Sequence, residues 1–356
     1  MQIQEHVELA ERTTLGVGGR ARYFVELKAE ADVPAAVAWA EAHDLPVFVL
    51  GGGSNLLVSD HGFAGLVLHM AIGGIYDSCD SCESCESREL GEGVLEAGAG
   101  ELWDDVVAAG VARGWAGIEC LSGIPGLAGA TPVQNVGAYG QEVASAITRV
   151  RAWDRAQSEW VELEAGACGF QYRSSRFNQM DRERFVITRV GFKLRPGGAA
   201  EIGYPELRRR FPDGAPALGA VREAVLDIRR GKAMLAGQVR SAGSFFKNPV
   251  LSAGEWANLA ARVEGPIPQF AAGRAGIKVP AAWLIEQAGF SKGYRALAGG
   301  VGLSPQHALA IVNRDHARAT AVVGLARRIQ LAVDARFGIR LEPEPVQLGF
   351  HPGEEV

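Results

Sequence analysis

The sequence predicts a mixed α/β and α+β fold with more than one domain. With 356 residues, of which 47% are hydrophobic and 22% charged, the chain can form two or three domains with a sizeable core. Segments with strand and helix periodicity alternate through its first half. Two glycine-rich loops each follow an apolar segment, and the first of them lies at the exit of a predicted strand–helix–strand unit.

The first predicted strand follows the turn TTLGVGG, within residues 13–27. Residues 32–43 have apolar side chains at helical spacing, with Asp32 as the expected N-cap and Pro34 in the first turn. A second strand, residues 47–50, leads into GGGSN and a further apolar strand. Strand, helix and strand form a βαβ unit, whose exit loop is a natural place for ligand phosphates.

The stretch LSGIPGLAGATPVQNVGAYG, residues 121–140, follows a short strand near Gly93 and a helix across residues 102–113. Glycine adopts positive φ readily, so successive N–H groups can turn toward one anion or a flat ring. The alternative is a buried turn without a ligand. Together with GGGSN, this stretch could grip two ends of one extended ligand.

Residues 147–163 and 185–194 alternate like half-buried strands, with FQYRSSRF between them. Residues 220–234 form an amphipathic helix near a domain junction. The arginines at 208–210 and at 229–230 are interpreted as solvated surface.

The last third begins with SAGSFFKNPV and contains a helix with Pro280 near its start and Gly289 just past its end. A short strand, ALAIVN, precedes a long amphipathic helix over residues 317–337. The chain closes with FGIRLEPEPVQLGF, an expected final strand that carries Glu342 and Glu344.

Composition excludes several function classes. A net charge of −5 and a pI near 5.9 argue against a nucleic-acid partner. The sequence has no apolar run of membrane-span length and no signal peptide, so we expect a cytoplasmic protein without a membrane partner. The pair Gly231 and Lys232 is followed by Ala, so a Walker nucleotide-binding motif is not formed.

A low-complexity run, DSCDSCESCES, contains Cys79, Cys82 and Cys85 at CxxCxxC spacing. This spacing can hold a soft metal or part of an iron–sulfur cluster. A fourth ligand is not adjacent, and the hydrophilic run between glycines is typical of a tolerated surface insertion. We therefore expect this run to be a neutral surface insertion without a metal site, and metal binding remains the alternative.

Taken together, the motifs resemble the UDP-N-acetylenolpyruvoylglucosamine reductase family, in its longer, tyrosine-loop (type I) form. The resemblance covers almost the whole chain in the family's order. It rests on TTLGVGG, LGGGSNLLVSD, GIPGLAGATPVQNVGAYGQE, YRSSRF, EIGYPEL, GSFFKNP, AGFSKG and FGIRLEPE.

The resemblance implies an FAD-binding module of two α/β subdomains, of the PCMH or vanillyl-alcohol-oxidase type, and a C-terminal α+β substrate-binding domain. The implied limits are 1–72 for the first subdomain, with strand 338–356 returning to it, 73–213 for the second, 214–233 for a linker helix and 234–337 for the substrate domain. The implied reaction uses non-covalent FAD and NADPH to reduce UDP-N-acetylglucosamine enolpyruvate to UDP-N-acetylmuramate in peptidoglycan synthesis. We expect a monomer that acts on small molecules.

Three catalytic positions carry over from the family. Ser244 would protonate the carbanion, while Arg173 and Glu344 would polarise and stabilise the enolate-like intermediate. Taken alone, these residues could equally be a turn serine, a surface arginine and a solvated glutamate, with Glu342 competing for the last role. The resemblance implies cofactor contacts by Gly51, Gly52, Gly53, Ser54, Asn55, Gly123, Ile124, Pro125, Gly126, Gly129, Ala130, Gln134, Asn135 and Gly137. It suggests substrate contacts by Tyr172, Tyr204, Lys247, Asn248 and Lys292.

Two other function classes compete with this interpretation. A flavin oxidase of the same fold would use oxygen and could link its flavin through His61 or His69. A flavin- or sugar-nucleotide-binding regulator would lack catalysis. One departure from the family pattern bears on the site, because Pro345 and Val346 stand where many relatives have Val-Arg, which could alter the surroundings of Glu344.

Overall fold

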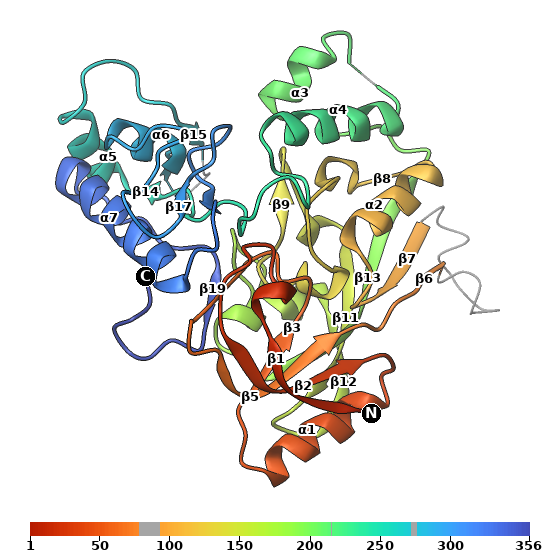
Figure 1. Cartoon of the computed structure of the whole chain (residues 1–356). Coiled ribbons are helices and arrows are strands. Elements are labelled where there is room, and N and C mark those ends of the chain that lie inside the picture. The colour runs from red at the N-terminus through yellow and green to blue at the C-terminus, as the bar shows by residue number, and fades with distance from the viewer. Residues whose placement is uncertain (78–92, 215, 272–275) are drawn as a thin grey trace. The chain divides into compact units, whose positions relative to one another are not determined.

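The computed structural model describes residues 1–77, 93–214, 216–271 and 276–356 (Figure 1). Cys79, Cys82 and Cys85, the cysteines of the possible metal motif, lie outside these ranges. Across the described ranges, every helix is too short or too polar to cross a bilayer.

The chain divides into two compact units. Unit 1 comprises residues 1–7, 22–52 and 64–230, and unit 2 comprises residues 8–21, 53–63 and 231–356. The chain therefore passes from unit 1 to unit 2 after Val7, within the GGGSN loop after Gly52, and near the end of the predicted linker helix after Arg230.

The first sheet of unit 1 has the strand order β1-β2-β5-β3. Its elements are β1 (Ile3–Glu8), β2 (Arg20–Leu27), β3 (Val47–Leu50) and β5 (Phe63–Met70), with α1 (Asp32–Ala42) between β2 and β3. The predicted strand, helix and strand are all present. β5 separates β2 from β3 and pairs parallel with β3, so the strands that flank α1 are not neighbours.

The predicted N-cap of α1 is wrong by one position. Ala31 is the N-cap, and Asp32 is the first residue of the helix. The carboxylate of Asp32 turns back and accepts the N–H groups of Lys28 at 3.3 Å and Ala29 at 3.1 Å. It therefore closes the turn before the helix.

The second sheet of unit 1 has the order β12-β11-β13-β7-β6, and β8 also pairs with β13. Its strands are β6 (Ile75–Asp77), β7 (Gly93–Gly98), β8 (Trp115–Ala116), β11 (Ile147–Asp154), β12 (Glu159–Glu164) and β13 (Phe185–Pro196). The predicted strand at 147–163 is an antiparallel hairpin, in which Trp153 faces Trp160. Asp154 turns the chain by accepting the N–H of Ala156 at 2.9 Å.

One hydrophobic cluster of unit 1 includes residues from both sheets and from α2 (Trp103–Ala112). Leu66 of the first sheet, Leu95 of the second and Trp103 of α2 are at most 1% exposed. A smaller cluster joins α3 (Pro205–Arg210) to α4 (Leu218–Gly231) through Leu207 and Val225. The amphipathic helix predicted at 220–234 is α4.

In the described part of unit 2, short strand pairs and three α-helices surround a separate hydrophobic core. The strands are β4 (Leu56–Val58) with β19 (Val346–Leu348), β17 (Val301–Leu303) with β18 (Ile311–Asn313), and the set β14 (Val250–Leu251), β16 (Ile277–Lys278) and β15 (Phe270–Ala271). The helices are α5 (Ala253–Ala260), α6 (Ala281–Gln287) and α7 (Ala319–Phe337). Trp283 of α6 stacks on Phe337 of α7, with ring centroids 6.0 Å apart.

The predicted final strand is wrong in its extent. β19 begins at Val346, so Glu342 and Glu344 precede it. Pro343 and Pro345 lack the N–H that a strand needs for its ladder, which explains the late start. The segment instead forms an isolated bridge between Phe246 and Pro343.

Candidate active site

The two glycine-rich segments meet within unit 1. A side chain on Gly52 would place its Cβ 3.0 Å from the Cα of Gly126, and one on Gly51 would lie 3.7 Å from the Cβ of Ala130. Because the main chains approach so closely, their N–H and C=O groups can face a ligand directly. The loop continues into unit 2 at Gly53, which has φ +61° and no room for a Cβ beside the carbonyl of Arg12.

Gly123, at the start of the second segment, is held from both sides of its backbone. Its N–H donates to Asp104 Oδ1 of α2 at 2.6 Å, and its carbonyl accepts from Arg229 Nε of α4 at 3.0 Å. Arg222, also on α4, donates to both oxygens of Asp104 at 2.7 and 2.8 Å. The φ of Gly123 is +69°, a conformation that favours glycine.

The surface interpretation of Arg229 is therefore wrong. Its side chain is buried, with 6% of the residue exposed, and burial lowers the pKa of its guanidinium. Burial would raise the pKa of Asp104, but hydrogen bonds from Arg222 and Gly123 hold it below its usual value. Arg222 and Arg229 are seven residues apart, so they share a face of α4. This spacing is the sequence signal that the two arginines act together. The arginines at 208–210 and Arg230 are exposed, as predicted.

Two of the predicted cofactor residues have internal partners. A Cβ on Gly129 would overlap Ala99, so glycine is required there for packing. Asn135 is 1% exposed, with φ +45°. Its amide donates to Glu142 Oε2 at 2.9 Å and to the carbonyl of Gln171 at 3.0 Å, and its Oδ1 accepts the N–H of Ala144.

Arg173 lies at the tip of a tight turn beside the same loop. Gln171 and Ser174 exchange backbone hydrogen bonds at 2.8 and 3.1 Å, and this turn puts Arg173 at φ +53°. Its Nη2 donates to the carbonyl of Gly137 at 2.7 Å, and its guanidinium lies 5.2 Å from the ring centre of Tyr172. A non-glycine residue with positive φ costs about 1–3 kcal/mol, and such residues cluster at functional sites.

Tyr204 packs edge-on against Tyr139, with ring centroids 5.4 Å apart. Burial raises the pKa of both hydroxyls, that of Tyr139 to about 12. Tyr139 has φ +50° and was not singled out from the sequence. It lines a hollow of about 540 Å³ with Gly140, Glu201, Ile202, Gly203, Arg208, Phe211, Pro212 and Gly214.

In unit 2, Ser244 and Glu344 lie on neighbouring segments. The N–H of Glu344 donates to the carbonyl of Phe245 at 2.9 Å, and the N–H of Lys247 donates to the carbonyl of Glu342. Asn55 Nδ2 donates to the carbonyl of Glu344 at 3.2 Å. The predicted proton donor, the predicted carboxylate and one predicted cofactor residue therefore belong to one body, whereas Arg173 belongs to unit 1.

The other predicted substrate residues of unit 2 have structural partners or solvent exposure. Lys247 Nζ lies 3.3 Å from Glu342 Oε2, and the Glu342 side chain is 74% exposed. Asn248 Oδ1 accepts the N–H of Ala281 at 2.9 Å, which caps α6. Lys292 is exposed. The substrate roles of Lys247, Asn248 and Lys292 therefore stay predictions.

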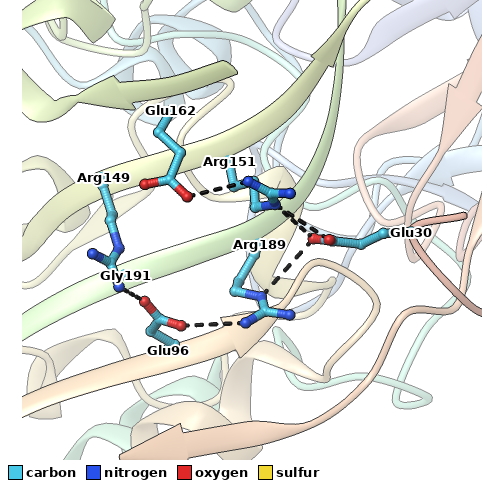
Figure 2. A pocket seen from close by; sticks show the side chains of 7 residues that line it. All are labelled: Glu30, Glu96, Arg149, Arg151, Glu162, Arg189 and Gly191. Carbon is cyan, nitrogen blue, oxygen red and sulfur yellow. Dashed lines mark hydrogen bonds and ion pairs between the residues drawn. The ribbon is translucent and has the colours of Figure 1, made fainter. Parts of the chain in front are cut away.

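A second hollow, of about 310 Å³, lies on the β12-β11-β13-β7 sheet (Figure 2). Its lining is Glu30, Glu96, Arg149, Arg151, Glu162, Arg189 and Gly191. Arg151 pairs with Glu30 and Glu162 at 3.2 Å, Arg189 pairs with Glu96 at 3.4 Å, and Arg149 also pairs with Glu96. Three arginines neutralise three glutamates, so this hollow is a structural ion-pair network.

Comparisons with known proteins agree with the motif order. Residues 21–164 match the model of an FAD binding domain, and residues 235–348 match that of the UDP-N-acetylenolpyruvoylglucosamine reductase C-terminal domain. The chain is 46% identical to the UDP-N-acetylenolpyruvoylglucosamine reductase of Nocardia farcinica, over 98% of this chain and 90% of the relative. It is 43% identical to that of Thermobifida fusca, over 97% of each. The chain belongs to the UDP-N-acetylenolpyruvoylglucosamine reductase family.

A solved structure supports the same assignment. The crystal structure of the UDP-N-acetylenolpyruvylglucosamine reductase from Thermus caldophilus superposes with a TM-score of 0.66 at 26% identity, over 98% of this chain and 100% of its own. The predicted fold class, an FAD-binding module followed by a C-terminal α+β domain, is confirmed for this reductase family member. The FAD-domain match contains both glycine-rich loops, and the reductase-domain match contains Ser244 and Glu344.

Proposed function

We infer that this chain reduces UDP-N-acetylglucosamine enolpyruvate to UDP-N-acetylmuramate, with FAD as its cofactor and NADPH as the reductant. The observation that carries this conclusion is 40–46% identity to reductases of this name over nearly the whole chain. It is an FAD-containing oxidoreductase of peptidoglycan precursor synthesis, and its substrates are small molecules. We further propose that it acts as a cytoplasmic monomer.

The residues of the glycine-rich segments fit an FAD ligand. Residues 51–55 and the residues of 123–137 predicted for the cofactor would hold its diphosphate and its flat ring through the main chain. Two observations support this proposal. Gly52 and Gly126 approach each other without side chains between them, and hydrogen bonds hold the backbone of Gly123 in place. When bound, FAD supplies the hydride chemistry.

Three residues have separate proposed roles in substrate reduction. Ser244 Oγ gives a proton to the carbon beside the carboxylate. The planar guanidinium of Arg173 stabilises the negative charge that develops on that carboxylate. Glu344 acts with Arg173 to polarise and stabilise the enolate-like intermediate. The hydrogen bond between Glu344 and Phe245, next to Ser244, and the strained turn at Arg173 support the proposal.

Substrate contacts are proposed for Tyr172, Tyr204, Lys247, Asn248 and Lys292. The lysines match the charge of a sugar-nucleotide diphosphate, and Tyr204 would cover the pocket. The packing of Tyr204 against Tyr139 supports a defined position for its ring. We retain the division into 1–72 with 338–356, 73–213, 214–233 and 234–337 as a proposal, which limited proteolysis can test.

The function is tested with the purified yellow protein under anaerobic conditions. NADPH is expected to bleach the flavin absorbance, and the enolpyruvyl sugar nucleotide is expected to restore it in one equivalent. A flavin oxidase would recover its absorbance only with oxygen, and a non-catalytic regulator would not be bleached. Either result would overturn the reductase assignment.

A further inference from the structure

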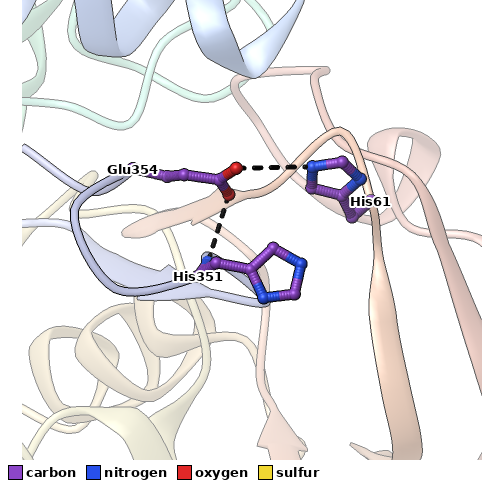
Figure 3. A group of neighbouring side chains, drawn as sticks. All are labelled: His61, His351 and Glu354. Carbon is purple, nitrogen blue, oxygen red and sulfur yellow. Dashed lines mark hydrogen bonds and ion pairs between the residues drawn. The ribbon is translucent and has the colours of Figure 1, made fainter.

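We propose that His61, His351 and Glu354 form a binding site for a divalent transition-metal ion such as Zn²⁺. All three residues belong to unit 2 and point toward one another (Figure 3). One ligand atom from each lies within 4.8 Å of the other two. His61 Nε2 is 3.6 Å from Glu354 Oε1, and the two imidazole centroids are 5.3 Å apart.

The backbone that carries His61 is fixed. The N–H of His61 donates to Ser59 Oγ at 3.2 Å, and that of Gly62 donates to the carbonyl of Ser59 at 2.9 Å. The N–H of Ser59 donates in turn to the carbonyl of Leu348 at 2.8 Å. A Cβ on Gly349 would overlap the carbonyl of Gly62, so this loop and the C-terminal segment are in direct contact.

The C-terminal segment that carries the other two ligands is also held in place. The N–H of Glu354 donates to the carbonyl of His351 at 3.0 Å, and the N–H of His351 donates to Glu354 Oε2 at 3.1 Å. That bond orients the carboxylate, so Oε1 is the oxygen near His61. Arg327 of α7 binds the carbonyls of Gly353 and Glu355, and Gln347 accepts the N–H of Val356 at 2.7 Å.

The ligand set identifies the class of ion. Two imidazoles and one carboxylate suit Zn²⁺ and neighbouring transition metals, whereas Mg²⁺ and Ca²⁺ prefer oxygen ligands. Bonds of about 2.0–2.2 Å place the ligand atoms of a tetrahedral ion roughly 3.4 Å apart. The ligand atoms now lie within 4.8 Å of one another, so they must move closer to bind an ion. Rotation of the side chains can bring them together, because the His61 and Glu354 side chains are 62% and 44% exposed. Water would fill the remaining position.

A bound ion would link the 59–62 loop to the C-terminal segment, and it would therefore stabilise the folded state. The proposal is independent of the reductase activity, since it assigns no step of the reaction to the metal. It also gives His61 a role different from flavin attachment.

Zinc binding is measured by isothermal titration calorimetry on the FAD-loaded, full-length chain without a histidine tag. Because Cys79, Cys82 and Cys85 could take the same ion, all measurements use a background with Cys79→Ser, Cys82→Ser and Cys85→Ser. We expect one equivalent of Zn²⁺ to bind. His61→Ala, His351→Ala and Glu354→Gln should each weaken binding at least about 10-fold.

The matched controls are His316→Ala, an exposed histidine of the same unit, and Glu355→Gln, the neighbouring carboxylate. Both should bind Zn²⁺ like the parent, and Mg²⁺ should not compete. A zinc-dependent rise in the melting temperature should occur in the parent and disappear in His61→Ala. If no stoichiometric binding is observed, or if the three ligand variants bind as tightly as the controls, the proposal is wrong.

Discussion

Arg229 Nε donates to the carbonyl of Gly123 at 3.0 Å across 106 positions of sequence. This bond joins a buried arginine of α4 to Gly123, in the second glycine-rich segment of the proposed flavin cradle. The bond fixes a carbonyl that, without a partner, would be costly to bury.

Arg229→Met is therefore expected to weaken FAD binding by at least about 10-fold, or about 1.4 kcal/mol. Fluorescence titration of the apoprotein with FAD measures the change. Arg230→Met is the matched control, because the neighbouring side chain is exposed and pairs with Asp227. Equal affinity in the two variants would show that Arg229 does not support the cradle.

Asp104 gives a pH-dependent prediction. Hydrogen bonds from Arg222 and Gly123 outweigh burial and lower the pKa of its carboxyl in the folded state. A lowered folded-state pKa adds stability above the unfolded pKa of about 3.9, and this stability is lost as the pH falls through the folded value. The free energy of unfolding should differ between wild type and Asp104→Asn by about 1–2 kcal/mol from pH 8 to 5. The difference should shrink below about pH 4, and a constant difference down to pH 3 would contradict this account.

Ser244→Ala should separate the two half-reactions. Flavin reduction by NADPH should remain within about 2-fold of wild type, while reoxidation by the enolpyruvyl sugar nucleotide should slow by about 10²–10⁴-fold, the usual contribution of a general acid. Anaerobic stopped-flow absorbance follows both steps. An equal loss in both steps would remove Ser244 from proton transfer.

Glu344 and Glu342 can be distinguished by the same substitution at each position. Glu344→Gln should lower kcat by at least about 100-fold, because it removes the charge from a proposed catalytic carboxylate. Glu342→Gln should leave kcat within about 3-fold, since the Glu342 side chain is 74% exposed and forms a surface ion pair with Lys247. Steady-state turnover of both variants decides, and the reverse pattern would transfer the role to Glu342.

Asp154 is predicted to stabilise the second sheet. It is 1% exposed and accepts hydrogen bonds from Arg184 Nε at 3.0 Å and Nη2 at 2.6 Å. Asp154→Ala removes this buried acceptor of Arg184 and Ala156, while Arg184 keeps its ion pair with Asp181, so the free energy of unfolding should fall by about 1–3 kcal/mol. Glu164→Ala, at an exposed position of the same hairpin, should change it by less than about 0.5 kcal/mol. Denaturant titration compares the two variants.

Local patterns predicted most of the regular elements. β3, α2, α4, α6 and α7 lie where apolar periodicity placed them, because such periodicity depends on neighbouring residues alone. The errors fell where a side chain or a proline overrides the pattern. Asp32 turns back to the preceding loop, and Pro343 and Pro345 delay β19.

The sequence by itself determined the family, because eight motifs in a set order specify an FAD-binding module and a reductase domain. It also named Ser244, Arg173 and Glu344. Only the tertiary structure decided that Gly52 lies against Gly126. It also decided that Glu344 hydrogen-bonds to the carbonyl of Phe245, the residue after Ser244.

The structure alone also decided that Asp104 and Arg229 hold Gly123, and that His61 meets Glu354. These partners are up to several hundred residues apart along the chain. Periodicity and spacing report only which face of an element is buried, whereas the partner on that face is selected when distant elements pack. Helical spacing therefore puts Arg222 and Arg229 on one face of α4, but only packing decides that Arg229 is buried against Gly123 while Arg230 is exposed.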